Sequence, residues 1–220
     1  MKISLFTFLF IVGLFQSTNA QTSHLRFGTR IGGSISLLTG NFFTSKAKPT
    51  PGIGIYGGGL LIISLNNEWS LQQEVQYVVE IGKSVDELRV TAENGKQATM
   101  QVSTRHQVAA LRVPLLLRWS SGTSKAGNVG VVAGPVGSYI VSVKTYYSMD
   151  SVFNTPASTS ERDLTYLSER FQLGITAGVE YYITGNLSVD IRGVYSITNH
   201  VQTSYNASLS TLSLGAGYMF

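Results

Sequence analysis

The feature that most constrains this chain is a strict alternation of apolar residues with small or polar residues over long segments. Between residues 171 and 183 every odd position is apolar, and the even positions read Gln, Gly, Thr, Gly, Glu and Tyr. Successive side chains of a β-strand point to opposite faces, so this segment has one apolar face and one polar face. A period of two therefore predicts strands and not helices.

The same period recurs in seven further segments, which brings the expected number of strands to eight. Most are about 12 to 14 residues long, whereas strands of soluble domains average about 5 to 6. A tilted strand that crosses a membrane needs about 9 to 11 residues and a few more at the rims. The sequence therefore predicts an all-β fold, an eight-stranded antiparallel up-and-down transmembrane β-barrel. The seven segments are 25–37, 53–65, 69–81, 106–119, 128–142, 187–197 and 207–220.

The connections between these segments differ in length in a regular way. Residues 38–52, 82–105 and 143–168 form long connections, whereas 66–68 and 184–185 form tight turns. Long loops on one rim and short turns on the other are typical of an outer-membrane barrel.

Parity gives an expectation for the connection between the third and fourth strands. In most segments the odd residues are the apolar ones, so the numbers of two paired residues must sum to an even number for their faces to match. We therefore expect a three-residue turn, Glu93-Asn94-Gly95, with Gly95 in a left-handed conformation. The two strands would then continue beyond the membrane as a hairpin.

The composition of the polar face indicates that it points inward. This face consists mostly of Gly, Ser, Thr and Gln. Small side chains suit the interior of an eight-stranded barrel, which has room only for side chains. The alternative is a secreted, soluble lipocalin-like carrier, in which the apolar face lines the cavity and the outer face is rich in charges.

Eight charged residues fall on the polar face, and their charges balance. Burying unpaired charges costs several kcal/mol each, so we expect arginine–carboxylate pairs that fill the lumen. The predicted barrel is therefore plugged, and a narrow channel for small solutes is the alternative. The eight are Arg30, Glu74, Glu80, Arg112, Arg118, Glu180, Asp190 and Arg192.

The N-terminus has the layout of a cleavable signal peptide. Lys2 precedes an apolar run over 3–15, and a polar stretch ends at Ala20. We expect a signal peptide at 1–20 and a barrel domain at 21–220; an uncleaved membrane anchor is the alternative. The formal net charge of +4 includes no basic run, which argues against binding to nucleic acid.

Catalytic chemistry finds little support in the sequence. The histidines His24, His106 and His200 lie near strand ends or in a loop, without the spacing of a metal site or a triad. Glu180 and Asp190 would face each other across a turn at 184–186, where they could share a proton or bridge an arginine. We favour the arginine bridge and expect no catalytic residues, no metal and no cofactor.

Aromatic residues in the long connections are candidate contacts for a protein or glycan partner, since function often resides in loops on a rigid scaffold. The alternative is that these loops are simply solvated. The candidates are Phe42, Phe43, Tyr146, Tyr147 and Phe153.

Several stretches together resemble the PorT-like outer-membrane β-barrel proteins that are common in Bacteroidetes. The resemblance extends over nearly the whole mature chain, although Ala110-Leu111-Arg112-Val113 stand where the family usually has an aromatic-Leu-Glu-Ile type of run. It implies an eight-stranded barrel in the outer membrane of a Gram-negative cell envelope, in a family with some members linked to protein secretion. The stretches are "FGTRIGGSIS", "PGIGIYGGGLLI", "SLQQEVQYVVEIGK", "LRVPLLLRW", "GVVAGPVGSYI" and "LSLGAGYMF".

The last strand is expected to close the barrel by pairing with the first, near residues 26–36, because an open edge is not tolerated in lipid. Tyr218 and the terminal Phe220 also resemble the C-terminal signal that is read by the barrel-assembly machinery. We therefore expect a non-enzymatic integral outer-membrane barrel that contacts outer-membrane lipids and is inserted by this machinery.

Overall fold

The computed structural model describes residues 25–40, 48–91, 97–121, 126–149, 158–165, 170–198 and 207–220. The expected signal peptide, the turn at 93–95, two of the histidines and three of the loop aromatics lie outside these ranges. Those five residues are His24, His200, Phe42, Phe43 and Phe153. Within the described ranges, no helix is long and apolar enough to cross a membrane.

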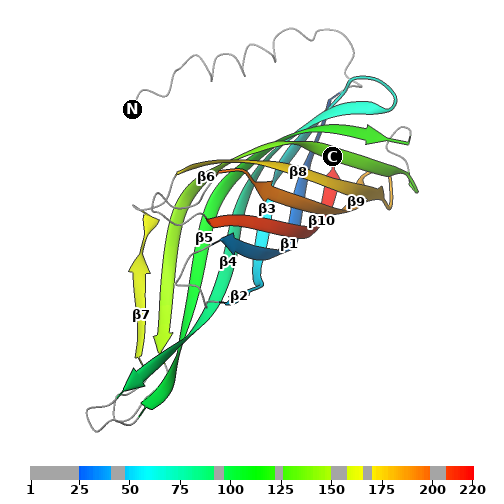
Figure 1. Ribbon diagram of the computed structural model, residues 1–220. Helices are drawn as coiled ribbons and strands as arrows, with labels where there is room; N and C mark the ends of the chain where they lie inside the picture. The colour runs from blue at the N-terminus through cyan, green and yellow to red at the C-terminus, as the bar shows by residue number, and fades with distance from the viewer. Residues whose placement is uncertain are drawn as a thin grey trace, which may run out of the picture.

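Eight long antiparallel strands form a closed ring (Figure 1). Each ring strand pairs with the next one along the chain, and the last pairs with the first, in the order β4-β3-β1-β10-β9-β8-β6-β5 with a further β4–β5 pairing. This confirms the eight-stranded up-and-down barrel. The ring strands are β1 (Leu25–Gly40), β3 (Gly52–Ser64), β4 (Trp69–Thr91), β5 (Gln97–Ser120), β6 (Val129–Met149), β8 (Phe171–Tyr182), β9 (Leu187–Ser196) and β10 (Ala207–Met219).

The seam between β1 and β10 is long and regular. Its register runs from Gly28 opposite Met219 to Gly40 opposite Ala207. The backbone N–H of Phe220 extends the seam by donating to the carbonyl of Phe27 at 2.9 Å. The prediction that the last strand pairs with the first is therefore confirmed, and the ring leaves no strand edge open to lipid.

The wall of the barrel is apolar outside and polar inside. Outward side chains such as Ile31, Leu214 and Phe171 are 68%, 63% and 66% exposed, while inward Ser, Thr, Gln and charged side chains are buried. A soluble protein places its side chains the other way round. The lipocalin-like arrangement is therefore wrong for this chain, and the outer wall suits contact with lipid.

Two strands continue far beyond the ring as a hairpin (Figure 1). The pairing of β4 with β5 runs from Trp69 opposite Trp119 to Thr91 opposite Gln97, and every pair sums to 188. This register has the even parity that was predicted. It confirms the long hairpin and leaves 92–96 as the residues that join its two strands.

The other two long connections are not simple loops, contrary to expectation. A short strand, β2 (Lys48–Thr50), pairs with β4, and β7 (Ser158–Asp163) pairs with the C-terminal part of β6. Tyr146 and Tyr147, which we expected in a loop, therefore lie in β6.

A β-bulge explains why alternation failed to predict the full length of β6. Ala110 lies opposite Ile140, but the next residue, Ala109, lies opposite Ser142, so Val141 is an extra residue on β6. An extra residue exchanges the two faces of a strand beyond it. Past the bulge, the even residue Tyr146 points outward.

Candidate functional site

The lumen holds the densest group of polar side chains in the described part of the barrel. The eight charged residues predicted to face inward all do so, because they lie on the polar face of their strands. Seven of them are at most 5% exposed, and Arg112 is partly exposed. Arg30 comes from β1, Glu74 and Glu80 from β4, Arg112 and Arg118 from β5, Glu180 from β8, and Asp190 and Arg192 from β9.

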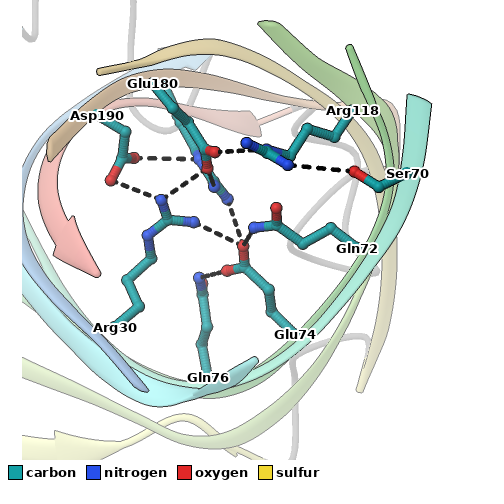
Figure 2. Close-up of polar contacts among 9 residues, drawn as sticks. Arg30, Ser70, Gln72, Glu74, Gln76, Arg118, Glu180 and Asp190 are labelled. Carbon is teal, nitrogen blue, oxygen red and sulfur yellow. Dashed lines mark hydrogen bonds and ion pairs between the residues drawn. The ribbon is translucent and has the colours of Figure 1, made fainter. Parts of the chain in front are cut away.

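Arg30 is the centre of the network (Figure 2). Its guanidinium donates to Glu74 at 2.6 Å, to Glu180 at 2.9 Å and to Asp190 at 2.7 Å. The three carboxylates come from three different strands, so one side chain links four strands of the ring. Charge-assisted contacts of this kind are the strong ones among hydrogen bonds.

Arg192 joins the same carboxylates from the other side. It contacts Glu74 at 2.7 Å, donates to Glu180, and its Nε lies 3.1 Å from Asp190 Oδ1. Arg118 adds a third guanidinium, 3.1 Å from Glu180, and lies 4.9 Å from the ring centroid of Tyr182. Three arginines and three carboxylates thus form a neutral cluster.

Neutral polar side chains complete the cluster. Gln72 and Gln76 each donate to Glu74 at 2.5 Å, and Ser70 accepts a hydrogen bond from Arg118 at 3.3 Å (Figure 2). These three residues were missed from the sequence. The signal was available, because they are even-numbered residues of β4 and share the inward face with Glu74.

A second ion pair lies apart from this cluster. Arg112 contacts Glu80 at 2.9 Å, and the hydroxyl of Thr211 donates to Glu80 at 3.0 Å. A small cavity lined by both side chains has a volume of about 20 Å³, enough for a single water molecule. This part of the lumen therefore leaves little free space.

Glu180 and Asp190 lie directly opposite each other on β8 and β9, as predicted. The turn between them is 184–186, in which the Thr184 hydroxyl accepts hydrogen bonds from the backbone N–H groups of Asn186 and Leu187 at 3.2 and 3.0 Å. Both carboxylates contact Arg30 and Arg192. This is the arginine bridge that we favoured over a proton-sharing pair.

His106 differs from expectation, because it does not lie near a strand end. It lies within the extended β5, is buried, and its Nδ1 is 2.9 Å from the hydroxyl oxygen of Thr145. Among the described residues, no group of three or more His, Cys, Asp or Glu could hold a metal ion.

The rim beyond the apolar band carries charged side chains that sequence reasoning did not single out. Lys83 of β4, Arg105 of β5 and Lys144 of β6 all point outward there. Lys144 forms an ion pair with Glu161 of β7 at 2.9 Å. The bulge in β6 and the pairing of β7 decide which of these charges meet, and neither feature shows as an alternation in the sequence.

Most of the sequence matches a known family. Residues 16–202 fit the model of the outer membrane protein beta-barrel domain. The chain belongs to this family. This outer-membrane barrel therefore resides in the outer membrane, which agrees with its apolar outer wall.

Several solved structures are similar to this outer-membrane barrel. Ail of Yersinia pestis is 13% identical, with 90% of this chain and 99% of Ail covered and a TM-score of 0.41. Neisserial surface protein A is 16% identical, with 88% and 97% covered and a TM-score of 0.42. OprG of Pseudomonas aeruginosa is 14% identical, with 89% and 94% covered and a TM-score of 0.37. A search of curated proteins found no match.

Proposed function

We propose that this outer-membrane barrel is a plugged, non-enzymatic scaffold that presents an extracellular β-sheet to a protein or glycan partner. The observation that carries the proposal is the contact between Arg192 and Glu74 at 2.7 Å. Their strands, β9 and β4, are four places apart in a ring of eight. Strands four apart are diametrically opposite, so this ion pair spans the lumen.

The residues around this contact support a closed lumen. Arg30 and Glu180 fill the space beside it, and Arg118 extends the cluster toward β5. All of these side chains are at most 5% exposed. Hydrated ions would have to displace charge-assisted hydrogen bonds from several strands at once, which argues against the narrow channel.

The extended strands support a role on the outer side of the membrane. β4, β5 and β6 continue past the apolar band, and β2 and β7 widen this sheet. Strands that only cross a membrane need about 9 to 11 residues, whereas β5 has 24. The additional length forms a surface that the barrel itself does not need.

The motifs of the first five strands and of the last support placing the chain among PorT-like members of the family.

Planar-bilayer recording on the refolded protein tests the plugged lumen. We expect no stable single-channel steps from the wild type. The double variant Glu74→Ala with Arg192→Ala removes one charge of each sign and the contact across the lumen, so we expect it to conduct. The double variant Lys144→Ala with Glu161→Ala removes an exposed pair and serves as the matched control, which should stay closed. Stable steps from the wild type would favour the small-solute channel.

A further inference from the structure

The outward face of β4 changes from apolar to basic within two residues. Tyr77, Val79 and Ile81 point outward in succession, and Lys83 is the next outward residue. Arg105 of β5 lies directly opposite Lys83, and Tyr146 of β6 lies directly opposite Arg105. The three side chains therefore form one row just beyond the apolar band, and Glu161 of β7, which lies opposite Tyr146, ends this row.

Lys83 and Arg105 are an unfavourable pair on their own. Side chains directly opposite each other in an antiparallel pair have Cβ atoms about 5 Å apart, and like charges there are destabilising. Both residues are exposed. Within the described ranges neither forms an ion pair, and the guanidinium of Arg105 lies 6.0 Å from the ring centroid of Tyr146. Lys83, Arg105 and Tyr146 thus present two cations and a phenol, and the carboxylate that ends the row, Glu161, binds Lys144 instead.

A third cation on this rim, Lys144, differs from Lys83 and Arg105 because it forms an ion pair. Lys144 donates to Glu161 at 2.9 Å and lies opposite Asp163. The side-chain and backbone hydrogen bonds of Thr165 hold the pKa of Asp163 below its usual value, so this carboxylate stays ionised. Acidic residues of β7 therefore compensate Lys144 and leave Lys83 and Arg105 uncompensated.

We propose that Lys83, Arg105 and Tyr146 bind the phosphate group of an anionic lipid in the outer leaflet. The row lies on the outward wall immediately past Ile81, at the edge of the apolar band, which is where lipid headgroups would contact the barrel. A guanidinium fork and an ammonium group suit a phosphate, and an amphipathic phenol suits the interface. A soluble acidic partner would have to displace headgroups to reach this wall, so a lipid fits better. The inference rests on the long strands lying outside the cell and not on the plugged lumen.

Native mass spectrometry on the full mature barrel, released from phosphatidylcholine bilayers that contain phosphatidic acid, tests this site. We expect the wild type to retain phosphatidic acid preferentially. Since each basic side chain contributes about fivefold to binding of an anionic lipid, Arg105→Gln should lower the preference about fivefold and the double variant with Lys83→Gln about 30-fold. The double variant Lys144→Gln with Glu161→Gln is the matched control and should change it by less than about twofold, because it removes a pair that is already neutral.

Three outcomes would overturn the proposal. The first is no preference of the wild type for phosphatidic acid over phosphatidylcholine. The second is an equal loss in Arg105→Gln and in the double variant Lys144→Gln with Glu161→Gln, which would show an effect that is not specific to this site. The third is displacement of the lipid by inorganic phosphate at matched concentration, which would show a site for free anions. Heat-modifiable migration on a gel confirms that each variant is folded, and channel recordings of the same variants leave the plugged lumen to be judged separately.

Discussion

Arg30 and Asp190 contact each other across an intervening strand, with Nη2 2.7 Å from Oδ2 although β10 separates their strands. The residue of β10 opposite Asp190 is Gly215, and a Cβ there would lie 2.9 Å from Asp190 Oδ2 and 2.3 Å from Tyr56 Oη. Gly215 pairs with Gly32, where a Cβ would lie 2.5 Å from Tyr56 Oη. The ring of Tyr56 thus lies over a glycine pair at the closing seam, beside the ion pair.

We predict that Gly32→Ala destabilises the barrel by about 1–3 kcal/mol, because the added methyl group overpacks the seam against Tyr56 and the carbonyl of Leu214. The adjacent Gly33 points outward, and a Cβ there would meet only the carbonyl of Gly54 at 3.8 Å. Gly33→Ala should therefore leave the stability unchanged or raise it by roughly 0.5 kcal/mol. Urea unfolding in lipid vesicles measures both, and similar losses in the two variants would contradict the packing argument.

We predict that Arg30→Met costs about 3–5 kcal/mol of unfolding free energy, because it removes one of the two guanidinium groups that Glu74, Glu180 and Asp190 share and leaves a buried negative charge uncompensated. Arg112→Met removes a guanidinium that has one carboxylate partner and is partly exposed, so its cost should be smaller. The urea midpoints of the two variants give the comparison. A loss in Arg112→Met that equals or exceeds the loss in Arg30→Met would contradict a hub role for Arg30.

The inward residues could be predicted from the sequence because the period of two is a property of the strand itself. Arg30, Glu74 and Asp190 each share parity with the serines of their own strand, and that parity decides the face. Which charges touch depends instead on how the strands are staggered around the ring. The contact of Arg192 with Glu74 across the lumen follows from that stagger, and no local pattern contains it.

The rim formed by the extensions of β4, β5 and β6 was the least predictable part for a related reason. One extra residue, Val141, exchanges the faces of β6 beyond it. The alternation that identifies the outward residues in the first part of β6 therefore no longer applies after Val141. β2 has three residues and β7 has six, and each forms only because a longer strand offers an edge to pair with. Pairing of this kind is a tertiary effect that outweighs local propensity.

We predict that shortening the β4–β5 hairpin leaves the ring intact. Within the described ranges, residues 87–91 and 97–101 pair only with each other, whereas Val102 still pairs with β6. Replacing 87–101 with a short turn should change the unfolding free energy by at most about 0.5 kcal/mol, since a two-stranded ribbon is marginal by itself. Gel migration and urea unfolding test this, and failure to assemble would show that the hairpin is needed for folding.

The last prediction concerns the C-terminal aromatic residue. Phe220 is 75% exposed and packs edge to face on Tyr218, with ring centroids 5.9 Å apart. A charge on the lipid face near an interface costs at most about 1 kcal/mol, which is too little to prevent folding. We propose that Phe220 also serves in recognition by the assembly machinery, so Phe220→Asp should strongly reduce insertion in cells.

Tyr181→Asp changes an outward aromatic residue near the same rim and is the matched control. Spontaneous refolding of both variants into vesicles should be nearly normal. Equal insertion of both variants in cells would show that Phe220 contributes only its contacts with lipid and Tyr218.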